Sequence, residues 1–134
     1  MDDNDSHDGS HGHEVYDLFQ RGRGFLSENH PGQAALLLER AKRLAPDKNS
    51  IREALGHAYF NVGHYDKAAA EFRLVVERVP SNDYATYALG RSLLKLGRLT
   101  EARAHLRLAL AMSPGNEHYR IALARCLNAE DETA

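Results

Sequence analysis

Apolar side chains recur at every third or fourth position through most of the chain, and the clearest runs cover residues 51–62 and 68–79. This spacing places the apolar residues on one face of a helix. Residues 63–64 separate the two runs, and a proline begins the segment 80–82 that ends the second run. Proline lacks the amide hydrogen that a helix interior requires. The pattern therefore predicts two antiparallel helices, and no segment alternates with period two for long enough to predict a strand.

The predicted helix pair repeats along the chain with a period of 34 residues. Prolines recur at this interval, and small residues keep the same period in two further columns: Pro46, Pro80 and Pro114; Gly22, Gly56, Gly90 and Ala124; Ala34, Ala68 and Ala102. A small residue at a constant position in each helix allows two helices to cross closely. Because one helix pair cannot cover its own apolar face, successive pairs are expected to stack into a shared core.

The residues at these positions resemble the signature of the tetratricopeptide repeat family, W-x2-L-G-x2-Y followed by A-x3-F and P. The second unit matches it most fully, with Leu55-Gly56-x2-Tyr59, Ala68-x3-Phe72 and Pro80, and has Arg52 in place of the tryptophan. The first and third units keep the small residues and the proline, but leucine replaces the phenylalanine in both. The resemblance covers residues 15–129.

The resemblance implies an all-α fold, a right-handed solenoid of seven helices in antiparallel pairs. The expected repeats are about 15–48, 49–82 and 83–116, followed by a capping helix over 117–129. Residues 1–14 are expected to form a disordered acidic tail that contains histidines, and residues 130–134 an acidic C-terminal tail.

The capping helix leaves the oligomeric state open. Tyr119, Leu123 and Cys126 share one face of this helix and could form an uncovered apolar stripe. Self-association through such a stripe would give a weak homodimer. Polar residues on the same helix could instead keep the chain a monomer, because terminal repeats carry a polar outer face.

In the family, the first helices of successive repeats line a concave groove that binds peptides. Arg23, His57, Arg91 and Arg125 form one column with the period of the repeat. Arginine suits carboxylates, and arginine and aromatic side chains are enriched at binding hot spots. The resemblance thus implies a groove for a peptide, and the arginines favour an acidic peptide or a chain terminus. The candidate side chains are Tyr16, Phe19, Arg23, Glu53, His57, Tyr84, Tyr87, Arg91, Ile121 and Arg125, with Ser50, Ala54 and His118 beside them. The alternative is that the charged groups pair with Glu53 or are merely solvated.

One subgroup of the family, the heat-shock co-chaperones, clamps the C-terminal carboxylate of its client with lysines, asparagines and an arginine. In this sequence the clamp positions hold Phe19, Arg23, Ala54, Tyr84 and Ala88. Only Arg23 could act as a cation there. A conventional chaperone-tail adaptor is therefore not expected.

The charge of the chain is unevenly distributed. The net charge is −2, but residues 15–129 hold all 17 lysines and arginines against 11 acidic residues. Because residues 15–129 are mildly basic, an alternative is that the chain is a nucleic-acid-associated protein and binds the phosphates of the nucleic acid with this region. Lysine is sparse and both ends are acidic, so nucleic acid is the less favoured partner.

The remaining signals favour a non-catalytic protein. His7, His11 and His13 could bind a metal ion weakly, but a disordered segment offers no fixed geometry, so neither metal nor cofactor is expected. The acidic tail could regulate the groove or only be solvated.

No nucleophile, base and orienting group recur in a catalytic pattern, and no signal peptide or membrane span is visible. We expect a cytoplasmic protein-interaction module that serves as adaptor, scaffold or assembly factor.

Overall fold

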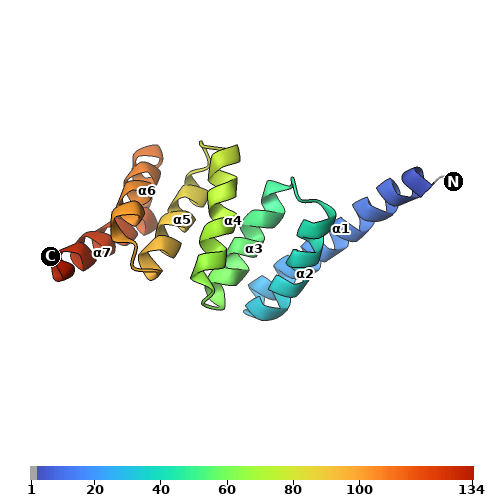
Figure 1. Cartoon of the computed structure of the whole chain (residues 1–134), viewed down its shortest axis with the longest axis horizontal. Helices are drawn as coiled ribbons and strands as arrows, with labels where there is room; N and C mark the ends of the chain where they lie inside the picture. Colours follow the sequence, from blue (N-terminus) through green and yellow to red (C-terminus); the bar gives the residue numbers. More distant parts are fainter. Residues whose placement is uncertain (1–2) are drawn as a thin grey trace.

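The computed structural model describes the backbone of residues 3–134 and the side chains of residues 12–134. The described chain is helical throughout and holds no strand. Its helices follow one another along a single axis, with the two termini at opposite ends (Figure 1). They are α1 (Asp3–Ser27), α2 (Pro31–Leu44), α3 (Asn49–Asn61), α4 (Tyr65–Arg78), α5 (Asp83–Lys95), α6 (Leu99–Met112) and α7 (Glu117–Thr133). The predicted all-α solenoid of seven helices is confirmed.

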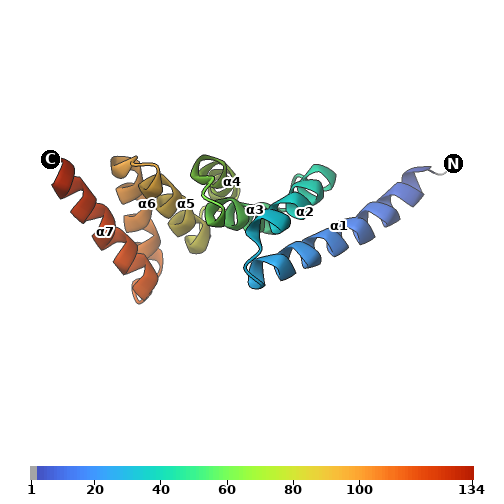
Figure 2. The ribbon, with the colours of Figure 1, turned by 90° about the horizontal axis from the view of Figure 1, so that it is seen from below.

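Each helix packs on its neighbours in sequence, which gives three antiparallel pairs: α1 with α2, α3 with α4, and α5 with α6. Helix α7 packs on α6 and closes the C-terminal end (Figure 2). The alternate helices α1, α3, α5 and α7 also contact one another in turn. These four helices therefore form one continuous surface along the solenoid.

The turn inside each helix pair needs a left-handed backbone conformation. Asn29, Gly63 and Gly97 occupy equivalent places, with φ angles of 64°, 88° and 77°. Glycine and asparagine adopt this conformation at low cost, because other side chains clash with the neighbouring carbonyl. Two of the three turns that follow a helix pair are capped instead, since the side chains of Asn82 and Asn116 accept hydrogen bonds from backbone amides at the starts of α5 and α7.

The glycine column fixes how closely the two helices of a pair approach. Gly22, Gly56 and Gly90 are buried, and each faces one large side chain of the second helix of its pair, namely Leu38, Phe72 and Leu106. A Cβ atom placed at Gly90 would lie 2.7 Å from Cγ of Leu106, which is too close for van der Waals contact. Glycine is thus required where the large residue of the A-x3-F motif enters the crossing.

The helical segments at both ends are longer than expected. Helix α1 begins at Asp3, inside the segment over 1–14 that was expected to be disordered, and no proline interrupts this segment. Metal binding by His7 and His11 concerns side chains outside the described residues. Helix α7 continues to Thr133, beyond the expected end at residue 129. Its last turns are held by an ion pair in which Arg103 of α6 contacts Glu130 at 2.6 Å.

The sequence left open an uncovered apolar stripe on the capping helix, and two of its three residues, Tyr119 and Cys126, are in fact buried. The ring of Tyr119 stacks on Tyr87 at 4.5 Å between ring centroids, and its hydroxyl donates to Asp83 at 2.8 Å. Cys126 is fully buried, and burial raises the pKa of its thiol. The sequence alone could not show that the preceding pair covers this face.

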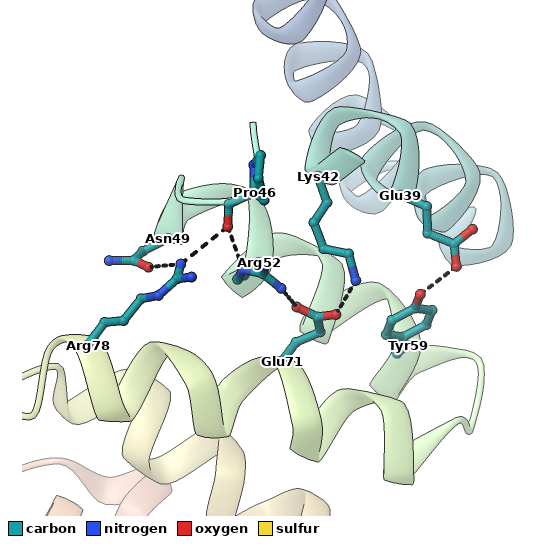
Figure 3. Close-up of polar contacts among 8 residues, drawn as sticks. All are labelled: Glu39, Lys42, Pro46, Asn49, Arg52, Tyr59, Glu71 and Arg78. Carbon is teal, nitrogen blue, oxygen red and sulfur yellow. Dashed lines mark hydrogen bonds and ion pairs between the residues drawn. The ribbon is translucent and has the colours of Figure 1, made fainter. Parts of the chain in front are cut away.

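A buried carboxylate joins the first and second helix pairs (Figure 3). Glu71 of α4 is 7% exposed and binds Lys42 of α2 at 2.7 Å and Arg52 of α3 at 3.0 Å. Arg52 stands where the family signature has tryptophan, and its Nε donates to the carbonyl of Pro46 at 2.9 Å. Arg78 donates to the same carbonyl at 3.3 Å. The network therefore fixes the connection between α2 and α3 as well as the packing of the three helices.

The close crossing at Gly90 predicts that replacing this glycine by alanine destabilises the fold, whereas the same replacement at a helical glycine with free space around it stabilises the fold. We expect Gly90→Ala to lower the free energy of unfolding by about 1–3 kcal/mol, because the buried Leu106 has no space to move. Gly24→Ala in α1 is the matched control, since a Cβ atom there meets nothing within 4 Å. It should raise the free energy of unfolding by about 0.4–1 kcal/mol. Urea denaturation measures both, and equal effects would contradict the close-crossing argument.

Removing the charge of Glu71 should also destabilise the fold. Glu71→Gln leaves Lys42 and Arg52 close together without a counter-charge, so we expect a loss of about 2–4 kcal/mol in the free energy of unfolding. Glu77→Gln on the same helix is the control, because Glu77 is exposed and forms no ion pair among the described residues. A change below about 0.5 kcal/mol is expected for it. If the two variants are equally stable, the network contributes nothing to stability.

Candidate peptide-binding groove

Two hollows lie along the surface formed by α1, α3, α5 and α7. The first, which we call the N-terminal hollow, has a volume of about 540 Å³ and is bounded by α1, α3 and the start of α5. It brings together five of the predicted side chains: Phe19, Arg23, Glu53, His57 and Tyr84. Ser50 and Ala54 line it as well.

The second, which we call the C-terminal hollow, has a volume of about 360 Å³ and lies between α5 and α7. It brings together four more of the predicted side chains, and its lining consists of Tyr87, Arg91, Leu94, Lys95, His118, Ile121, Ala122 and Arg125. Tyr84 and Tyr87 connect the two hollows, because their rings lie one helical turn apart on α5 with centroids 6.2 Å apart. We refer to both hollows together as the groove.

Tyr16 is the one predicted site residue that the structure places outside the groove. It is 66% exposed and lines a separate apolar depression of about 380 Å³ with Val15, Leu44 and Ile51. Phe19 borders both this depression and the N-terminal hollow.

Two of the three arginines of the groove lie against aromatic rings rather than against carboxylates. Cζ of Arg91 lies 4.4 Å from the ring centroid of Phe60 and 5.6 Å from that of Tyr87. Cζ of Arg23 lies 5.6 Å from the ring centroid of Phe19. A guanidinium stacked on a ring keeps its charge and its N–H donors, which lie in its own plane. The stacking therefore orients the cations and leaves them able to bind an anion.

The alternative that Glu53 neutralises these cations does not hold for the described side chains. Glu53 accepts a hydrogen bond from the side chain of Asn82 at 2.7 Å. No ion pair among residues 12–134 involves Arg23, Arg91 or Arg125. The groove thus keeps an unneutralised positive charge.

His57 lines the N-terminal hollow, with its Nδ1 3.3 Å from the hydroxyl of Tyr84. Burial lowers the pKa of His57, and the positive charge of Arg91 lowers it further, while Glu53 opposes the shift. Burial also raises the pKa of Tyr84, with Glu53 adding to the effect. Both groups are therefore neutral near pH 7, and His57 is poised to gain a proton when an anion approaches.

Sequence reasoning missed several lining residues of the hollows, of which Lys95 alone is charged, and it also missed Phe60, which contacts Arg91 from outside the lining. Lys95 follows Arg91 by four residues and so shares its helix face, a periodicity that could have identified it. Phe60 reads as an ordinary apolar residue of α3. Its contact with Arg91 joins two repeats, and that pairing depends on how the repeats stack.

The N-terminal hollow coincides with the clamp of the co-chaperone subgroup. Four of the five clamp positions, Phe19, Arg23, Ala54 and Tyr84, line it, and Arg23 is the single cation among them. The C-terminal hollow holds none of the clamp positions. Within residues 12–134 no three metal-ligating side chains gather, and none of the described helices is long and apolar enough to cross a membrane.

Comparisons with known proteins agree with this architecture. The sequence model of the tetratricopeptide repeat family matches residues 53–117. No curated protein matches the chain in sequence. The C-terminal tetratricopeptide-repeat-containing domain of a putative FK506-binding protein from Plasmodium falciparum is 22% identical, with a TM-score of 0.87 and 94% of each chain covered.

Two further solved structures contain bound peptides. The first tetratricopeptide repeat domain of Spaghetti (RPAP3), bound to the HSP90 peptide SRMEEVD, is 18% identical with a TM-score of 0.82, covering 89% of this chain and 94% of that one. The second such domain of human RPAP3, in complex with the HSP70 peptide SGPTIEEVD, is 21% identical with a TM-score of 0.80, covering 87% and 97%. At these identities the likeness establishes the fold alone. Together with the repeat motifs and the family match over residues 53–117, it shows that the chain has the tetratricopeptide repeat fold, with three helix pairs and a capping helix.

Proposed function

We propose that this chain is a non-catalytic interaction module that binds an acidic peptide segment of a partner protein in the groove. The observation that carries the proposal is the set of three arginines in the two hollows, which have no carboxylate partner among the described residues; two of them, Arg23 and Arg91, lie against aromatic rings. Charge-assisted hydrogen bonds from arginine to carboxylate are among the strongest available to a peptide. Two proteins of the same fold bind peptides that carry the acidic sequence EEVD.

The groove is better suited to acidic side chains within a segment than to a free C-terminal carboxylate. Arg23 is the single cation at the clamp positions, and the other arginines lie further along the solenoid, in the C-terminal hollow. A bound segment would therefore run along the groove and place its acidic side chains near both hollows. An adaptor, scaffold or assembly factor would use such a groove to hold its partner.

Reversing the charge at Arg91 provides a direct test. In fluorescence anisotropy with labelled SRMEEVD and with its C-terminal amide, we expect the wild-type chain to bind both probes with similar affinity. Arg91→Glu should weaken binding of both by about 2–5 kcal/mol, because a repelling carboxylate replaces the donor.

The matched control for this variant is Arg107→Glu. Arg107 is exposed on α6, outside the four helices of the groove, and forms no ion pair among the described residues. It makes the same charge change and should leave both affinities nearly unaltered. If Arg91→Glu folds, as judged by circular dichroism, and binds as well as the wild-type chain, the groove assignment is wrong.

Binding should also depend on pH through His57. In the free chain its pKa is lowered, so the imidazole is neutral at pH 7.5, and a bound carboxylate would raise that pKa. Lowering the pH to 5.5 therefore protonates His57 and tightens binding, by up to about tenfold for each pKa unit that the peptide adds. Peptide carboxylates with ordinary pKa values stay charged at this pH.

His57→Gln separates this effect from other titrations. The variant keeps a polar side chain of similar reach but cannot gain charge, so its affinity should rise less between pH 7.5 and 5.5. All other groove residues are the same in the two proteins, so the comparison isolates the contribution of position 57. An identical pH dependence of the two proteins would exclude His57 from contact with the acidic segment.

A further inference from the structure

The C-terminal hollow carries more positive charge than one carboxylate would neutralise. Four basic side chains line it, namely Arg91 and Lys95 of α5 and His118 and Arg125 of α7. Its lining includes no acidic residue, whereas that of the N-terminal hollow includes Glu53. The two halves of the groove therefore differ in the charge of the group that each can accept.

The four basic groups come from two helices and converge on one space of about 360 Å³. Arg91 and Lys95 are four residues apart, and His118 and Arg125 are seven apart, so each pair occupies one helix face. Cζ of Arg91 lies over Phe60, and Nζ of Lys95 lies 6.0 Å from the ring centroid of Tyr65. Uncharged aromatic rings thus position two of the four basic groups and do not neutralise their positive charge.

This arrangement fits a phosphate monoester better than a carboxylate. A phosphorylated side chain carries a charge of about −1.5 to −2 and three strong acceptor oxygens. Clusters of arginine are the general means by which proteins recognise such groups. We propose that the C-terminal hollow binds a phosphoserine or phosphothreonine side chain of the partner segment. This inference rests on the proposed function and specifies which segment the groove prefers.

Two observations favour a phosphopeptide over a nucleic acid. Arg40, Arg73 and Arg103 of the other helices form ion pairs, whereas none of the four basic groups of the C-terminal hollow does so among the described residues, so the hollow gathers unpaired charge in one space instead of along an extended basic stripe. The rings of Tyr87 and Tyr119 stack on each other at 4.5 Å and do not offer a free platform for a base.

The test compares three labelled peptide pools that are degenerate except for one central residue, which is phosphoserine, glutamate or serine. Fluorescence anisotropy with the full chain should give at least about tenfold tighter binding of the phosphoserine pool than of the glutamate pool, equivalent to about one additional charge-assisted hydrogen bond. The double variant Lys95→Gln/Arg125→Gln should reduce this ratio to about one. Both residues are exposed, so the variant is expected to fold.

Arg23→Gln in the N-terminal hollow is the matched control. It removes one positive charge from the other half of the groove, so it should weaken binding of both acidic pools and leave their ratio unchanged. Equal binding of the phosphoserine and glutamate pools would overturn the inference and leave the proposed function intact. Absence of binding to any pool would overturn both. Tighter binding of an oligothymidylate strand, lost in the double variant, would assign the hollow to nucleic acid instead.

Discussion

The close crossing of the two helices in each pair is the constraint on which the rest of this structure depends. At Gly22, Gly56 and Gly90 the absence of a side chain lets Leu38, Phe72 and Leu106 fill the space between the helices. Because the same crossing is made three times, the first helices recur at the same place in each pair. The groove follows from this regularity, since residues one period apart fall on one line along the solenoid.

The charged side chains divide according to the surface on which they lie. Between repeats, cations pair with carboxylates, as Lys42 and Arg52 do with Glu71. Along the groove, Arg23 and Arg91 lie against aromatic rings. An ion pair uses the charge to hold the fold together, whereas a stacked guanidinium keeps its charge for a ligand. Part of the positive charge that looks evenly spread in the sequence is therefore available to a ligand along the groove.

Most of the fold could be predicted from the sequence, because the repeat period is carried by residues that act locally. The glycines, alanines and prolines determine where each helix begins, crosses and ends, and nine of the ten predicted site residues line the two hollows. The failures concern contacts between repeats. The burial of Tyr119 and Cys126 depends on how α7 docks, and the role of Phe60 depends on the neighbouring repeat. Helix α7 also extends past its expected end, where Glu130 meets Arg103.

The stacked pair of Tyr87 and Tyr119 has a consequence for the dynamics of the C-terminal end. One ring lines the C-terminal hollow and the other anchors the capping helix, so the hollow exists only while α7 is docked. In a solenoid each unit is stabilised by its neighbours alone, and a terminal helix therefore frays before the centre unfolds. A ligand between α5 and α7 binds the docked state and suppresses that fraying. Binding of a ligand in the groove therefore slows the amide hydrogen exchange of the last helix.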